Sequence, residues 1–200
     1  TKKIARKAKK KQGYAGDNPT LKEALESVEQ DEWVKAIQAE LRQLSEKDSW
    51  KILDSLPRGA KWIPAHFVLK RKRQADGSVD KYKAGLVAGG HMQLPTMYDK
   101  TTSPTACAES IRLIFALAAK MSLIPRMFDV TGAYLLAILE SPVPIYMIIP
   151  GILGQPSTIV QILKSLYGLK QAGYLWHKLL HSKLLEVGLT PTTADPCVYT

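Results

Sequence analysis

Residues 62–90 read WIPAHFVLKRKRQADGSVDKYKAGLVAGG, and the arrangement of the fold can be inferred outward from them. An apolar run at 63–69 and a second one ending at Ala88 flank Asp76-Gly77, a pair typical of tight turns. This pattern predicts a β-hairpin. Six basic residues lie on it: Lys70, Arg71, Lys72, Arg73, Lys81 and Lys83. Such a hairpin either lies along a phosphate backbone or is an ordinary solvated surface, and charge alone favours neither.

On both sides of the hairpin the pattern is mixed. Thr20 and Glu23 have the spacing of a capping box, which predicts that a helix begins there. Apolar spacing predicts helices at 20–28, 31–47, 108–122 and 170–187, with the third apolar enough to belong to the core. Strands are predicted at 126–130, 143–149 and 159–163. This order predicts an α+β fold rather than a doubly wound sheet.

The basic charge is concentrated in two short segments. The 200-residue chain has a net charge of +10. Residues 1–11 hold seven positive charges and no acid, and residues 61–91 hold seven against two acids. A polyanion partner such as nucleic acid is the more specific interpretation, and solubility is the simpler one.

The rest of the composition excludes several classes. Two cysteines 90 positions apart exclude a disulfide scaffold, and no Cys/His spacing indicates zinc. His177 and His181 lie at i and i+4 but lack a joining motif, so structural histidines are favoured over a metal pair. We find no secretory signal and no membrane span. An intracellular protein is therefore expected, cytoplasmic, with the nucleus as the alternative because the start is lysine-rich.

Three motifs together resemble the reverse transcriptase of copia-type LTR retrotransposons. They are Lys81-Tyr82-Lys83-Ala84-Gly85-Leu86-Val87-Ala88, Phe128-Asp129-Val130-Thr131-Gly132-Ala133-Tyr134-Leu135 and Ser165-Leu166-Tyr167-Gly168-Leu169-Lys170-Gln171-Ala172. The likeness covers roughly residues 20–200 in the family's order. It implies fingers and an incomplete ferredoxin-like palm, with a helical lead-in at 20–60, the fingers-like hairpin at 61–106 and a partial palm at 107–200. The basic composition of residues 1–19, outside the likeness, predicts a flexible linker before them.

The resemblance also implies a reaction and its residues. The parent enzyme would join deoxynucleotides to a DNA primer on an RNA template, with two Mg²⁺ ions, or Mn²⁺ as the alternative, holding the reacting oxygens. Asp129 would be the first catalytic, metal-binding carboxylate, assisted by the Val130 carbonyl. Tyr134 would exclude a ribose 2′-hydroxyl. The other nucleotide and template contacts would be Gly168, Lys170 and Gln171, and the phosphate contacts Lys70, Lys72 and Lys83.

The sequence also departs from the family. Gly85 and Gly89 stand where an arginine and a lysine are expected, and glycine cannot supply the arginine's charge or its bidentate fork. The second carboxylate pair, in a Tyr-x-Asp-Asp hairpin, is expected after Tyr199 but is absent, as are the rest of the palm, the thumb and the ribonuclease H region. We therefore expect no polymerase activity from this chain. The alternatives are a non-catalytic nucleic-acid-binding module and a non-functional transposon remnant.

Overall fold

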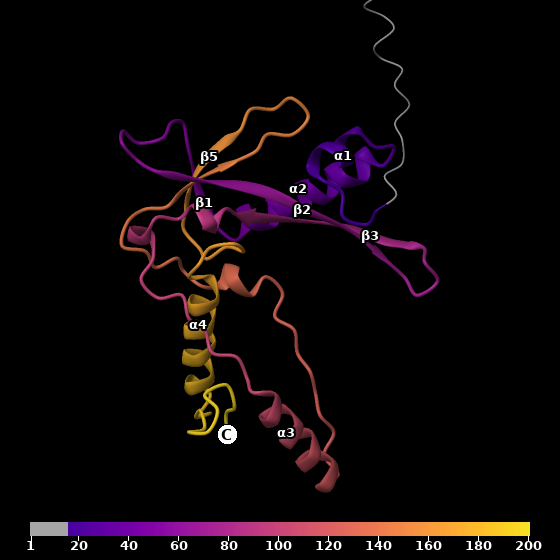
Figure 1. The fold of residues 1–200 in the computed structure, drawn as a ribbon, viewed down its shortest axis with the longest axis vertical. Helices are drawn as coiled ribbons and strands as arrows, with labels where there is room; N and C mark the ends of the chain where they lie inside the picture. The colour runs from indigo at the N-terminus through magenta and orange to yellow at the C-terminus, as the bar shows by residue number, and fades with distance from the viewer. Residues whose placement is uncertain (1–15) are drawn as a thin grey trace, which may run out of the picture.

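The hairpin predicted at 62–90 forms the longest part of a five-stranded sheet in the computed structural model, which describes residues 16–200 (Figure 1). The strands are β1 (Trp50–Leu53), β2 (Trp62–Arg73), β3 (Val79–Ala88), β4 (Tyr146–Ile149) and β5 (Thr158–Ile162). The helices are α1 (Leu21–Glu26), α2 (Gln30–Glu46), α3 (Ala108–Lys120) and α4 (Ala172–Glu186). The α+β prediction is confirmed. Most of the predicted basic linker, residues 1–15, lies outside the described residues.

The sheet has the order β1-β5-β4-β2-β3, and all neighbours are antiparallel except β2 and β4. Along β2, buried residues alternate with exposed ones, which is the period of a strand with one face in the core. The turn closes where Asp76 accepts from both the amide and the hydroxyl of Ser78. The fully buried centre of the core combines Ile63, Met147 and Val160 from three adjacent strands.

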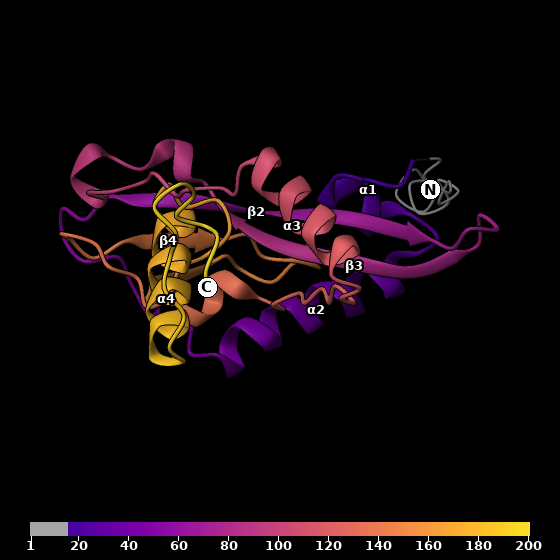
Figure 2. The same ribbon diagram turned by 90° about the horizontal axis from the view of Figure 1, so that it is seen from below.

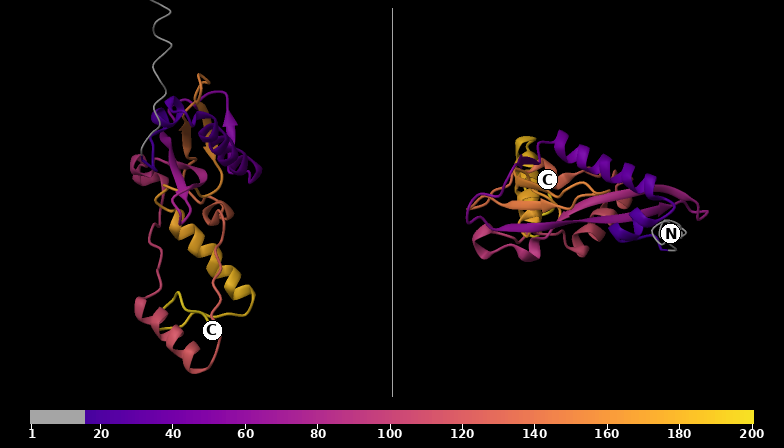
Figure 3. Two further views of the ribbon diagram at one scale, coloured as in Figure 1. Left: turned by 90° about the vertical axis from the view of Figure 1, so that its right-hand side faces the viewer. Right: turned by 90° about the horizontal axis from the view of Figure 1, so that it is seen from above.

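Helix α2 packs along one face of the hairpin (Figure 2 and Figure 3, right). Trp33, Ile37 and Leu44 are buried, and their spacing of four and seven residues gives the apolar stripe that the sequence predicts. The predicted capping box is confirmed, because Thr20 accepts from the Glu23 amide and the Glu23 carboxylate accepts from the Thr20 amide.

Short 3₁₀ turns connect the sheet to the C-terminal half. They are η1 (Gly90–Met92), η2 (Pro95–Met97) and η3 (Ala133–Leu136). Segment 137–139 is tied to 163–165 by hydrogen bonds from the Leu139 amide to the Leu163 carbonyl and from the Ser165 amide to the Ala137 carbonyl. These ties place η3 beside the loop that leads into α4.

The prediction that α3 belongs to the core is wrong. The helix forms, but Ala118 is its only buried residue, and Leu113 and Phe115 are 58% and 57% exposed. Figures 1 and 3 show α3 away from the sheet, near the C-terminal segment. The apolar pattern correctly indicated a helix, but most of its large apolar side chains are exposed in the described part of the chain. No helix within residues 16–200 is long and apolar enough to cross a membrane.

The strand predicted at 126–130 is also wrong. This segment is irregular, and Met127 and Phe128 are 96% and 87% exposed. A strand requires a neighbouring strand to accept and donate its backbone hydrogen bonds. Among residues 16–200, no strand lies beside it, so the β-forming sequence of this segment is not sufficient.

We predict that the 200-residue chain self-associates through α3. Substituting Leu113→Ser and Phe115→Ser should raise the dissociation constant about tenfold or more, because burying one large apolar side chain contributes about 1.5–3 kcal/mol. Sedimentation velocity over a concentration series measures this. The matched control replaces the isolated exposed residues Val28 and Ile52 with serine. A wild-type chain that stays monomeric at high concentration would contradict the prediction.

Candidate nucleic-acid interface

Four lysines share one exposed face of the hairpin. The strand register places Lys70 directly opposite Lys83, and Lys72 directly opposite Lys81. Directly opposed residues have Cβ atoms about 5 Å apart, where like charges destabilise the pair. All four side chains are exposed, and none forms an ion pair within the described part of the chain. We call Lys70, Lys72, Lys81 and Lys83 the lysine face.

The two arginines that alternate with Lys70 and Lys72 along β2, Arg71 and Arg73, have a different role. Arg71 is 5% exposed and forms an ion pair with Glu29. Arg73 donates from Nε to Asp17 at 2.9 Å. Tyr82 donates to Glu29, and its burial, with the Glu29 carboxylate, raises the Tyr82 pKa. Arg71 is therefore used in internal packing, whereas the exposed Arg73 binds the end of the predicted linker, at Asp17, to the hairpin.

The two glycines that depart from the family pattern have different surroundings. A Cβ at Gly85 would meet only the Val68 carbonyl, at 4.0 Å. A Cβ at Gly89 would lie 2.8 Å from both the Pro64 ring and the Pro64 carbonyl, whose oxygen accepts from the Gly89 amide. At Gly85 there is thus room for a side chain on the hairpin face between Lys83 and Val87. At Gly89, in contrast, Pro64 already occupies the space that a side chain would need.

This difference predicts opposite results for two substitutions toward the family residues. Gly85→Arg should change the free energy of unfolding by less than about 0.5 kcal/mol and increase affinity for a nucleic-acid duplex. Gly89→Lys should cost about 1–3 kcal/mol, because Pro64 must shift. Urea denaturation and fluorescence anisotropy measure the two quantities. Equal stability losses in the two variants would contradict the prediction.

The predicted site residue Gly168 joins the hairpin to the loop before α4. The Ala88 amide donates to the Tyr167 carbonyl at 2.8 Å. Gly168 has φ +93°, and a Cβ there would lie 2.1 Å from the Ala88 carbonyl oxygen. Only glycine combines this backbone conformation with such a close approach. The structure therefore places Gly168 at a packing contact between the two motifs.

Lys170 and Gln171 belong to a hydrogen-bond network that the sequence did not indicate. Gln171 is 2% exposed; it accepts from Gln93 Nε2 at 3.0 Å and donates to the Met97 carbonyl at 3.2 Å. Lys170 donates from Nζ to Tyr98 Oη at 3.1 Å, and its amide donates to Gln93 Oε1. Gln93 lies in an irregular segment without any periodic signal, so only tertiary packing identifies it.

Tyr134 and Asp129, to which the resemblance gives roles in the same reaction, are in different surroundings. The Tyr134 ring is half-buried against the Tyr167 ring, with centroids 4.5 Å apart. Asp129 and Val130 lie on the exposed irregular segment after α3. No hydrogen bond or ion pair within residues 16–200 includes Asp129. The structure thus joins Tyr134, Gly168, Lys170 and Gln171 through neighbouring contacts, while Asp129 and the lysine face stand apart.

A buried aspartate that had no assigned role holds α3 to the C-terminal segment. Asp195 accepts from the amides of Cys107, at the start of α3, and Cys197. Together with the Ser110 hydroxyl, which has the largest effect, these donors lower the Asp195 pKa. The carboxylate in turn raises the Cys107 pKa, and burial raises that of Cys197. Both shifts disfavour the thiolate, which is the form of cysteine that binds metals.

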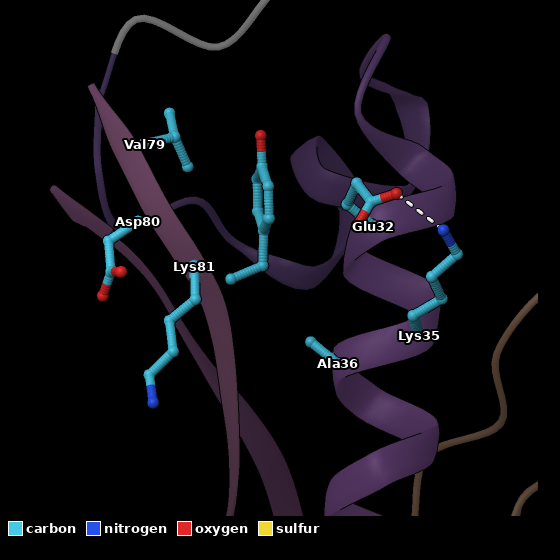
Figure 4. Close-up of a pocket in the computed structure, with 7 residues that line it drawn as sticks. Glu32, Lys35, Ala36, Val79, Asp80 and Lys81 are labelled. Carbon is cyan, nitrogen blue, oxygen red and sulfur yellow. Dashed lines mark hydrogen bonds and ion pairs between the residues drawn. The ribbon is translucent and has the colours of Figure 1, made fainter.

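A shallow cleft of about 500 Å³ lies between α2 and β3. Figure 4 shows Glu32, Lys35 and Ala36 on the helix side, and Asp80 and Lys81 on the strand side. The two acids and two lysines of its lining balance, and Glu32 is already paired with Lys35 at 2.7 Å. Its charge therefore favours neither an anionic nor a cationic ligand.

Known proteins similar to this chain agree on one family. A model of the family described as "Reverse transcriptase (RNA-dependent DNA polymerase)" matches residues 47–200. The chain is 35% identical, over 90% of its length, to the Retrovirus-related Pol polyprotein from transposon TNT 1-94 of Nicotiana tabacum. It is 30% identical, over 97% of its length, to the Retrovirus-related Pol polyprotein from transposon RE2 of Arabidopsis thaliana. It spans only 14% of either polyprotein, and no solved structure matches it.

Proposed function

Because the chain belongs to the reverse transcriptase (RNA-dependent DNA polymerase) family, we propose that it forms the fingers and front part of the palm of a copia-type retrotransposon enzyme. The lysine face is the observation that supports this most strongly. Two directly opposed lysine pairs cost folding free energy unless a polyanion lies over them. A template–primer duplex has the charge to offset that cost.

The chemistry requires more than this chain supplies. The family generally uses divalent metal ions. Among residues 16–200, no three His, Cys, Asp or Glu side chains are grouped so as to hold one. Asp129, with the Val130 carbonyl, does not make a metal site by itself. We propose that Asp129 contributes one ligand to a Mg²⁺ site whose other carboxylates come from the longer parent protein.

The remaining predicted site residues fit supporting roles in this proposal. Tyr134 would present its ring to the sugar of the incoming nucleotide, with Tyr167 packed behind it. Lys70, Lys72 and Lys83 would bind backbone phosphates, which is a positioning role with no sequence preference. Gly168 and Gln171 would hold the loops that shape the site, because both are fully used in packing contacts.

Primer extension on an RNA template tests the proposal. The 200-residue chain should bind the template–primer duplex but incorporate no deoxynucleotide with Mg²⁺ or Mn²⁺. The longer parent protein should extend the primer, and Asp129→Asn in that protein should abolish extension, since one carboxylate ligand is lost. Asp99→Asn, at another exposed aspartate, is the matched control. Extension by the Asp129→Asn parent would overturn the assignment.

A non-catalytic nucleic-acid-binding module is the second candidate. It is favoured by the combination of a lysine face and the lack, among the described residues, of any group of three potential metal ligands around Asp129. The primer-extension experiment also separates the polymerase fragment from the binding module. Duplex binding by both proteins with no extension by the longer parent would support the binding module.

A further inference from the structure

A second cationic site lies at the opposite end of β2 from the hairpin turn. A cavity of about 320 Å³ is formed where the loop before β2, the turn at η2 and the start of β4 meet. Its lining includes Arg58, Lys61, Leu94, Met97, Val143 and Tyr146. In Figure 1 these segments lie at the end of the sheet where β2 begins, away from the hairpin turn.

The charge of this cavity is one-sided. Arg58 and Lys61 are the only charged residues in its lining. Both side chains are exposed, and neither forms an ion pair in the described part of the chain. The cleft beside α2, in contrast, has balanced charges. A cavity with two unpaired cations and no acid selects an anionic ligand.

An aromatic surface adjoins the two cations. Tyr146 pairs in register with Trp62 across the parallel strands β4 and β2. Paired residues on neighbouring strands point to the same face of a sheet, with strands about 4.8 Å apart. Trp62 is 46% exposed, and Leu94 and Val143 at the cavity rim are 43% and 39% exposed. The site therefore offers flat apolar surface next to positive charge.

The wall of the cavity is held in place before any ligand binds. The Met97 carbonyl accepts from Gln171 Nε2 at 3.2 Å and from Ser141 Oγ at 2.8 Å. Gln171 is fixed in turn by Gln93. A prearranged wall reduces the ordering cost of binding. Gln171 thus affects more than its own loop, because its side-chain amide holds the η2 turn in place through the Met97 carbonyl.

We propose that this cavity binds a segment of single-stranded nucleic acid, with phosphates on Arg58 and Lys61 and a base against Tyr146, beside which the exposed Trp62 lies in register on β2. Positive charge beside aromatic rings is the combination that recognises single strands. A cavity of this volume is at the small end for ligand sites and admits one nucleotide rather than a duplex. The proposal rests on the proposed function, because it assumes a nucleic-acid partner. The cavity and the lysine face are separate sites near opposite ends of β2: since a strand rises about 3.3 Å per residue, Lys61 of the cavity and Lys70 of the lysine face lie about 30 Å apart.

Fluorescence anisotropy with a labelled oligothymidine strand tests the site in the 200-residue chain. Arg58→Ala with Lys61→Ala should weaken single-strand binding about tenfold and reduce the slope of log affinity against log salt by about 1.4, the value for two single-strand phosphates. Binding should also quench Trp62 fluorescence. Trp62→Phe should remove that part of the quenching while the protein still binds. The control is Lys22→Ala with Arg42→Ala, which removes one lysine and one arginine on α1 and α2.

The outcomes separate this site from the lysine face. A duplex probe should bind the Arg58/Lys61 variant as well as wild type, and lose affinity in a Lys70→Ala/Lys72→Ala variant. If neither variant loses affinity for the duplex, the proposed function is contradicted instead of the cavity proposal. If the Arg58/Lys61 variant and its control bind the single strand equally, the cavity proposal is overturned. It is also overturned if a hexaglutamate peptide competes more strongly than the oligothymidine, which would indicate an acidic protein partner.

Discussion

Replacing Lys70 and Lys81 with glutamate should stabilise the protein while it nearly abolishes duplex binding. Both like-charge pairs become opposite-charge pairs, because the register places each substituted position opposite an unchanged lysine, Lys83 or Lys72. Cross-strand opposite charges contribute roughly 0.2–1 kcal/mol each, and a repulsion of similar size is removed from each pair. The free energy of unfolding should therefore rise by about 1 kcal/mol, measured by urea denaturation.

The same double variant should lose duplex affinity by about two orders of magnitude at low salt. Two phosphate contacts disappear, so the slope of log affinity against log salt should fall by about 1.8. Two new negative charges add repulsion. Anisotropy with a labelled RNA–DNA duplex measures both. Lys22→Glu with Arg42→Glu makes the same change in net charge away from the hairpin and serves as the control.

The experiment is informative because the free energy of unfolding and the duplex affinity are expected to change in opposite directions. A residue that merely helps the hairpin fold would lower stability and binding together. A solvated surface of no function would gain the same stability, because the repulsion is relieved in either case, but its duplex binding would fall no further than that of the control. Only a surface kept cationic for a partner gains stability when the repulsion is removed and loses binding at the same time. Destabilisation of the double variant, or binding equal to that of the control, would contradict the prediction.

Local patterns predicted those elements whose stability is itself local or periodic. The hairpin follows from its two apolar runs and its Asp76-Gly77 turn, and the start of α1 follows from the Thr20 and Glu23 pair. The segment around Asp129 failed because strand formation depends on a partner strand, and none of the described strands lies beside it. The apolar pattern of α3 predicted its helix but could not show what covers it.

The site was predicted only as a set of residue types. Strand alternation could separate Lys70 from Arg71, but the opposed lysine pairs required the register that the turn sets. The burial of Gln171 depends on Gln93, 78 residues earlier, and neither position has a local signal. Cys107 and Cys197 meet through Asp195 for the same reason. Such contacts come from long-range packing, which periodicity does not encode.

Removing the Arg71 guanidinium should destabilise the protein by about 3 kcal/mol. Its side chain is only 4% exposed and is paired with Glu29, which is 25% exposed. Nη1 also donates to the Gly16 carbonyl at 3.3 Å, and the guanidinium lies 5.9 Å from the Tyr82 ring centroid. Breaking a buried ion pair from one side costs about 3–5 kcal/mol, because the remaining charge is left uncompensated. Because Glu29 is partly exposed, we expect the loss of stability in Arg71→Met to lie at the lower end of this range.

Two further variants identify the cause of that loss. Arg71→Met with Glu29→Gln should recover roughly 1 kcal/mol, because the unpaired charge is gone while the amide oxygen can still accept from Tyr82. Lys70→Ala, one position away on the exposed face, should stay within about 0.5 kcal/mol of wild type. Urea denaturation followed by tryptophan fluorescence measures these changes; among the tryptophans, Trp33 packs edge-on against Tyr82, with ring centroids 4.7 Å apart. If Arg71→Met and Lys70→Ala cost the same, the hairpin arginine belongs with the lysines as a surface cation, and the division between packing and binding residues along β2 is wrong.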